Sequence, residues 1–100
     1  MAWTIELSSK AEKELLALST EDRKRVGRYL DDLLTLETPR DRGRALTGQF
    51  RGYWRYRIGD VRVICDVEDR RLVIVALRIG RRNQVYDSPL PRRVRGRPER

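Results

Sequence analysis

The chain has 100 residues, of which 39% are apolar and 38% charged, and its formal net charge is +8 at pH 7. This length suffices for one small domain with a modest core, and the composition is typical of a soluble globular protein. No apolar run reaches about 18 residues, the minimum for a membrane-spanning helix. No basic segment followed by an apolar one opens the sequence, as it would in a secretory signal. We therefore expect a cytoplasmic protein that has no membrane partner.

Histidine is absent, and Cys65 is the only cysteine. The chain thus lacks the most common metal ligand and the most common general base, and one thiol cannot form a zinc site or an internal disulfide. Metal-dependent hydrolysis and serine–histidine–aspartate chemistry are therefore poor hypotheses, and we expect no metal and no cofactor. Cys65 itself is predicted to be a small buried strand residue.

Of the 23 basic residues, 20 are arginines, whose planar guanidinium pairs with phosphate through two parallel hydrogen bonds. Residues 51–82 hold nine arginines against four acidic residues, whereas residues 1–37 hold six basic residues against eight acidic ones. This concentration of positive charge in the C-terminal half predicts a polyanionic partner. The alternative is that many of these arginines form a solvated surface and reflect the base composition of the genome.

The N-terminal part of the chain predicts a strand and then two helices. Residues 3–7 alternate apolar and polar side chains, as an edge or half-buried strand does. Ser9 followed by Glu12 fits a capping box, and Ser19 followed by Asp22 repeats this start signal.

Apolar residues then recur at helical spacing through residues 10–36. They are Ala11, Leu15 and Leu18 in the first helix and Val26, Tyr29, Leu30, Leu33 and Leu34 in the second. The second pattern ends before Pro39, which cannot continue a helix. We expect an antiparallel helix hairpin whose apolar stripes cover one face of a sheet.

Residues 38–50 show no sustained period and contain a proline, two glycines and the arginines Arg40, Arg42 and Arg44. This pattern predicts a basic connecting loop. Its arginines either contact a phosphate backbone or are simply solvated.

Residues 52–66 predict two strands joined by a two-residue turn at Gly59-Asp60. A period of two places Trp54, Tyr56 and Ile58 on one face of the first strand and Tyr53, Arg55 and Arg57 on the other. In the second strand it separates Val61, Val63, Cys65 and Val67 from Arg62, Ile64 and Asp66. One face of this hairpin is therefore apolar, and the other is cationic.

The remainder of the chain predicts one more strand and a tail. Residues 72–79 are nearly all apolar, which suits a central strand covered on both faces. A polar segment follows and ends at Tyr86. Residues 88–100 contain three prolines and five arginines with little to bury, and we expect this tail to be disordered. Residues 1–87 then form a single domain.

These elements predict an α+β fold, a small antiparallel or mixed sheet of about four strands with the helix hairpin packed on one face. We expect Arg55, Arg57 and Arg62 to project from the opposite face of the sheet.

Four spaced pieces, in this order, closely resemble the RelE/ParE superfamily of type II toxin–antitoxin toxins over residues 1–87. They are Gly-Tyr-Trp-Arg-Tyr-Arg at 52–57, Gly-Asp-Val-Arg at 59–62, Ile-Gly-Arg-Arg at 79–82 and Val-Tyr at 85–86. The resemblance implies a small basic ribonuclease that cuts messenger RNA on the ribosome without a metal and is held inactive by a cognate antitoxin in a hetero-oligomer. The alternative is the ParE branch, whose members inhibit DNA gyrase on the same fold, but the joint presence of Arg82 and Tyr86 argues against it.

The resemblance also assigns roles to residues. Those predicted to be catalytic are Arg55, Arg57, Arg62, Arg82 and Tyr86. Apart from the resemblance, other arginines are predicted from their charge to contact RNA, namely Arg40, Arg42, Arg44, Arg51, Arg78 and Arg81. Arginine suits the stabilisation of a phosphate on which charge develops, and Tyr86 suits base stacking or proton transfer.

The general base is where this sequence departs from the family pattern. Relatives place a lysine, or a glutamate and a histidine, where a base is needed, whereas Arg55 and Arg57 stay protonated. Tyr86 is the first remaining candidate, with Asp66 or Asp87 behind it. A third hypothesis, from another class, is a basic RNA-binding module that has no catalytic activity.

Overall fold

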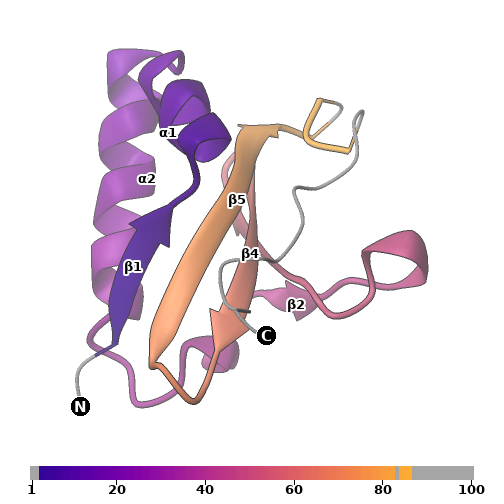
Figure 1. Ribbon diagram of the computed structural model, residues 1–100. Helices are drawn as coiled ribbons and strands as arrows, with labels where there is room; N and C mark the ends of the chain where they lie inside the picture. The colour runs from indigo at the N-terminus through magenta and orange to yellow at the C-terminus, as the bar shows by residue number, and fades with distance from the viewer. Residues whose placement is uncertain (1–2, 83, 87–100) are drawn as a thin grey trace.

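The computed structural model describes residues 3–82 and 84–86, which form two helices and a five-stranded sheet (Figure 1). The strands are β1 (Thr4–Leu7), β2 (Arg44–Ala45), β3 (Trp54–Ile58), β4 (Val61–Glu68) and β5 (Val73–Arg81). Their spatial order is β1-β5-β4-β3-β2, with β1 parallel to β5 and the other pairs antiparallel. The predicted α+β class and mixed sheet are confirmed. The predicted residues 88–100 tail lies outside the described residues, as does Asp87.

The sheet has five strands where the sequence predicted about four, because the basic loop contains β2. Its two residues pair with Arg55 and Trp54 at the outer edge of β3. Single turns of 3₁₀ helix at Pro39–Asp41 and Gly48–Phe50 lie on either side of it in the chain. Two residues are too few to show a period in the sequence, so only the pairing reveals this strand.

Two capped helices, α1 (Ser9–Leu16) and α2 (Thr20–Leu33), form the predicted hairpin on one face of the sheet (Figure 1). The Ser19 hydroxyl accepts a hydrogen bond from the Asp22 amide, as predicted. In α1 the cap is Ser8, whose hydroxyl accepts from the amide of Ala11, rather than Ser9. Ser8 has no glutamate three residues on and so lacks the capping-box pattern, but its amide and its hydroxyl both bond the backbone of β5, which places it at the start of the helix.

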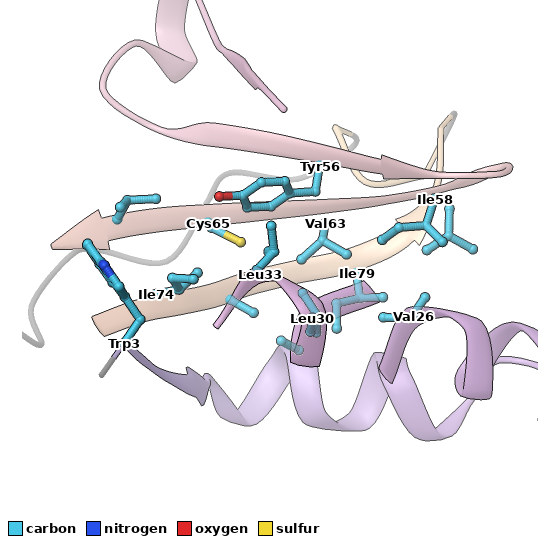
Figure 2. Close-up of a cluster of buried hydrophobic side chains, with 14 residues drawn as sticks. Trp3, Val26, Leu30, Leu33, Tyr56, Ile58, Val63, Cys65, Ile74 and Ile79 are labelled. Atoms are coloured by element: carbon cyan, nitrogen blue, oxygen red, sulfur yellow. The ribbon is translucent and has the colours of Figure 1, made fainter. Parts of the chain in front are cut away.

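The main core lies between the helices and the sheet (Figure 2). Its buried side chains include Trp3, Ala11, Val26, Leu30, Leu33, Tyr56, Ile58, Val61, Val63, Cys65, Val67, Ile74, Ala76 and Ile79. Burial raises the pKa of the Cys65 thiol above its ordinary value, which agrees with the inert buried residue predicted. The residues of β3 and β4 in this set are among those that the period of two assigned to the apolar face.

The β3–β4 turn and the central strand also match the sequence analysis. Gly59 has a φ of +61° in the two-residue loop between Ile58 and Val61, a conformation that side chains disfavour. Strand β5 lies between β1 and β4 and is buried on both faces. None of the helices in the described residues is long and apolar enough to cross a membrane.

Candidate active site

The face of the sheet opposite α1 and α2, hereafter the outer face, carries the arginines of the β3–β4 hairpin. Arg55 and Arg57 alternate along β3 with Tyr56 and Ile58, whose side chains enter the core on the helix side. Arg62 lies directly opposite Arg57 on β4. Like charges directly opposite each other in a sheet are destabilising, so the fold maintains this pair at a cost in stability.

Arg62 is the most unusual of these residues, because its side chain is buried and has no acidic partner among the described residues. The residue is 7% exposed, and its Nη1 donates to the carbonyl oxygens of Gly59 (2.9 Å) and Val61 (3.4 Å). Backbone dipoles of the hairpin turn thus hold the guanidinium. A buried cation without a counter-ion is expensive, and such groups concentrate at functional sites.

The other residues predicted to be catalytic surround Arg62. Burial lowers the pKa of its guanidinium most, and the positive charges of Arg57, Arg55 and Arg82 lower it further, while Tyr86 raises it. The structure therefore brings together five residues that come from β3, from β4 and from the turn after β5. Their catalytic roles stay predictions.

The turn that follows β5 sets the position of Tyr86. The amides of Gln84 and Val85 donate back to the carbonyl of Arg81, and the Val85 side chain is fully buried. The Tyr86 ring meets the ring of Phe50 edge to face at 5.4 Å. Its hydroxyl is buried and has no hydrogen-bond partner among the described residues. No group of the described residues therefore uses its hydrogen-bonding capacity.

Three arginines predicted to contact RNA are engaged in ion pairs. Arg40 pairs with Asp69 at 2.8 Å and also donates to the carbonyl of Val67. Arg81 lies 3.5 Å from Asp22 and 3.6 Å from a carboxylate oxygen of Asp60. Because they have intramolecular partners, Arg40 and Arg81 are poorer candidates for RNA contacts than the arginines without one.

The third, Arg78, forms an ion pair that no pattern in the sequence predicts. Its side chain is 6% exposed, and its Nη2 lies 3.0 Å from a carboxylate oxygen of Glu14 on α1. The same carboxylate accepts from the Ile79 amide at 2.8 Å. Strand β1 ends at Leu7, so Glu14 takes over as the hydrogen-bond partner along this edge of β5. Arg78 also donates to the carbonyl of Gln84 (3.5 Å), which links α1 to the turn that carries Tyr86.

The remaining arginines predicted to belong to the site form no ion pair within residues 3–82 and 84–86. They are the predicted catalytic arginines together with Arg42, Arg44 and Arg51. Sequence alone could not make this division, because each acidic partner of Arg40, Arg78 and Arg81 lies 21 or more positions away in the chain.

The candidate bases differ in their distance from Arg62. Asp66 lies four residues further along β4, about 13 Å at the rise of a strand, and its side chain is half-buried. Asp66 already takes part in an interaction within the fold. Of the described candidates, Tyr86 is therefore the one beside Arg62.

Comparison with protein families decides which family this arrangement represents. The model of the ParE toxin of the type II toxin–antitoxin system parDE matches residues 5–86. The chain belongs to the ParE toxin family. It is thus a toxin of the RelE/ParE superfamily, as the resemblance in the sequence indicated. Comparison with curated protein sequences finds no match.

Solved structures show the same RelE-like fold as this ParE family member. The toxin–antitoxin complex RelBE2 of Mycobacterium tuberculosis matches with a TM-score of 0.73 at 23% identity, over 82% of this chain and 93% of that one. The RelE–RelB complex of Pyrococcus horikoshii matches with a TM-score of 0.65 at 26% identity, over 84% and 99%. YafQ of Escherichia coli matches with a TM-score of 0.60 at 24% identity, over 82% and 96%.

Proposed function

We propose that this toxin is a metal-independent endoribonuclease that cuts messenger RNA on the ribosome. The observation that carries the proposal is the buried Arg62, which has no counter-ion among the described residues and lies within electrostatic range of Arg55, Arg57, Arg82 and Tyr86. A site of this kind is prepared for an anion, and a phosphodiester on which charge develops is the anion that the family resemblance suggests.

The chemistry requires three events at one phosphodiester. The ribose 2′-oxygen attacks phosphorus as its proton leaves, the bond from phosphorus to the 5′-oxygen breaks, and the 5′-oxygen gains a proton. The arginines stabilise the charge that develops on the non-bridging oxygens. The Tyr86 hydroxyl, buried and without a partner among the described residues, is the proposed proton-transfer group.

Purified protein mixed with messenger-programmed ribosomes tests this function. We expect cleavage in the presence of a chelator, and we expect Tyr86→Phe to keep ribosome binding while cleavage falls by a factor of about 10² or more. Tyr53→Phe, which removes a hydroxyl elsewhere on the outer face, is the matched control. Unchanged cleavage by Tyr86→Phe would return Tyr86 to a stacking role.

A second candidate function, inhibition of DNA gyrase, is favoured by the family model, whose description is a ParE toxin. A supercoiling assay with purified gyrase separates the two functions. If the protein leaves ribosome-bound messenger intact and blocks supercoiling, the ribonuclease proposal is wrong. If it does neither and its expression is harmless, a non-catalytic RNA-binding module takes precedence.

We further propose a cognate antitoxin that binds this toxin in a hetero-oligomer. Two of the relatives above were solved as complexes with an antitoxin. The net charge of +8 and the exposed Leu16 on α1 suit a partner segment that is acidic on one side and apolar on the other. Co-expression with a small protein encoded by the adjacent gene should give a stable complex and relieve toxicity. A lack of both effects would contradict the proposal.

A further inference from the structure

An arginine-lined pocket lies beside the candidate active site, at the outer edge of β3. It has a volume of about 180 Å³ and is lined by Tyr29, Gly43, Arg44, Arg55 and Arg57. Strand β2 pairs only with Trp54 and Arg55, so it leaves the rest of this edge of β3 without a neighbouring strand. The pocket therefore occupies a place where the sheet itself ends.

The lining of this pocket carries an excess of positive charge. Three of its five lining residues are arginines, none of them in an ion pair among the described residues, and no carboxylate lines it. A fourth guanidinium, that of Arg42, lies over the Tyr29 ring at 5.6 Å. The Nε of Arg55 is buried and has no hydrogen-bond partner in the described chain. An anion in the pocket would relieve the repulsion between these charges and provide acceptors for their donors.

The loop that forms the wall of the pocket is held in place before any ligand binds. Gly43 has a φ of +82°, and a Cβ there would lie 2.5 Å from both the Arg55 carbonyl oxygen and the Trp54 Nε1. Only glycine therefore allows the loop to approach β3 this closely. The Trp54 indole also donates to the Arg42 carbonyl at 2.8 Å. The backbone of this wall of the pocket is thus pre-organised.

The size of the pocket indicates what it takes. Pockets for drug-sized ligands measure about 300–1,000 Å³, so a pocket of about 180 Å³ suits a phosphate group better than a whole nucleotide. Arg55 and Arg57 line this pocket and also flank Arg62, so one strand that presents successive phosphates can reach both places. A chain of regularly spaced phosphates fits this continuity better than an isolated carboxylate on an acidic protein.

We propose that this arginine-lined pocket at the outer edge of β3 binds a second phosphate of the RNA strand, next to the phosphate at Arg62. This assignment rests on the proposed function, since it takes the strand at Arg62 to be RNA. Arg44, and Arg42 above the Tyr29 ring, are then residues that hold the substrate, and the pocket sets the direction in which the strand crosses β3.

Binding of a single-stranded RNA with 2′-O-methyl groups, which this chemistry cannot cleave, tests the pocket. Affinity is measured by fluorescence anisotropy between 50 and 200 mM salt. We expect Arg44→Gln to weaken binding and to reduce the slope of log affinity against log salt by about 0.7, the value for one phosphate contact to a single strand. Arg70→Gln removes the same charge at the exposed turn between β4 and β5 and is the matched control. Equal slopes for the two variants would overturn the proposal.

Two further measurements separate the alternatives. Inorganic phosphate should raise the Tm of the wild-type protein more than chloride at equal ionic strength. Arg44→Gln should reduce that difference, whereas Arg70→Gln should keep it. If Arg44→Gln instead weakens binding of poly-glutamate and leaves RNA binding unchanged, the pocket serves a protein partner and the proposal is wrong.

The pocket and the ribonuclease function fail in different ways. If Arg44→Gln reduces the salt slope on 2′-O-methyl RNA as expected while the wild-type protein leaves ribosome-bound messenger intact, the pocket is supported and the ribonuclease function is contradicted. If the wild-type protein cleaves the messenger and Arg44→Gln leaves the salt slope unchanged, the ribonuclease function is supported and the pocket proposal is wrong.

Discussion

Two buried arginines, Arg62 and Arg78, show how differently one residue type can be used in the same sheet. Both are nearly inaccessible, at 7% and 5% exposure. Arg78 has Glu14 as its counter-ion, whereas in the part of the chain that the structure describes Arg62 has backbone carbonyls and no acid. The first arrangement stabilises the fold, and the second keeps a cation ready for a ligand at a cost in stability.

This difference predicts opposite effects of the same substitution. Arg62→Leu should leave the free energy of unfolding unchanged or raise it by up to about 1 kcal/mol, because a buried unpaired charge is removed. Arg78→Leu should lower it by up to about 3 kcal/mol, because Glu14 is left without its partner. Urea denaturation measures both values.

Activity should rank the same two variants differently from stability. Arg62→Leu should lower messenger cleavage by a factor of about 10²–10³, the usual loss for one transition-state donor. If Arg62→Leu is strongly destabilising and Arg78→Leu is not, the structural assignment of both arginines is wrong.

Leu72 is a second residue whose conformation costs stability. It has a φ of +53° in the turn between β4 and β5, a region that leucine disfavours, and it is 36% exposed. Leu72→Asn should raise the free energy of unfolding by up to about 1 kcal/mol, because asparagine adopts this region more readily. Leu72→Ala, which keeps the disfavoured backbone, is the control and should give no gain. A loss of stability in Leu72→Asn would show that packing of the leucine outweighs the strain.

At the scale of elements, α1 contributes more than core packing, because Glu14 completes the edge of β5 after β1 has ended. Its carboxylate binds the Ile79 amide and Arg78, and Arg78 reaches the carbonyl of Gln84. Helix α1 thereby helps to position the turn that ends at Tyr86.

Glu14→Gln tests this link, since glutamine keeps an acceptor for the Ile79 amide but removes the charge that binds Arg78. We expect the Phe50–Tyr86 ring contact to weaken in nuclear Overhauser spectra, while core signals from Val26 and Val63 stay unchanged. Cleavage should fall in kcat with little change in KM. Glu12→Gln, on the exposed side of α1, is the control. An unchanged ring contact in Glu14→Gln would show that the turn holds its position without this ion pair.

Element types followed from sequence patterns wherever the pattern was long enough. The stripe from Val26 to Leu34 and the alternation from Trp54 to Val67 each extend over several repeats, and both match the structure. Strand β2 has two residues and no repeat, so its pairing with β3 was not foreseeable. The break in register between Ile64 and Cys65, opposite β5, is likewise absent from the pattern.

The grouping of the candidate site residues was predictable, and the division of the arginines was not. Alternation in β3 and β4 places Arg55, Arg57 and Arg62 on one face, which is a local property. Whether an arginine is free depends on acids that come from distant elements, such as Glu14 for Arg78 and Asp69 for Arg40. Periodicity contains no information about such long-range pairs.

For the whole molecule, the acidic groups buried in the core determine how stability depends on pH in the alkaline range. Burial raises the pKa of the Cys65 thiol and of the Tyr56 phenol, and it raises the pKa of Tyr29 less completely because Arg42 opposes it. The folded protein therefore holds these protons more tightly than the unfolded chain does. Stability is fully present below the unfolded pKa values and is lost as pH rises above them.

We accordingly expect the free energy of unfolding to be level at neutral pH and to begin to fall near pH 8.5, the ordinary pKa of a thiol. One fully buried group contributes a slope of about 1.4 kcal/mol per pH unit, and Tyr56 adds to the slope from about pH 10. Urea denaturation from pH 7 to 10.5 measures the curve. Cys65→Ala should move the onset to about pH 10, because only the phenols then remain. A wild-type curve that stays level to pH 10 would mean that the unfolded chain does not ionise this thiol more readily than the folded one. In that case the Cys65 side chain is not buried in solution as it is in this structure, where it points from β4 into the core between the sheet and the helices.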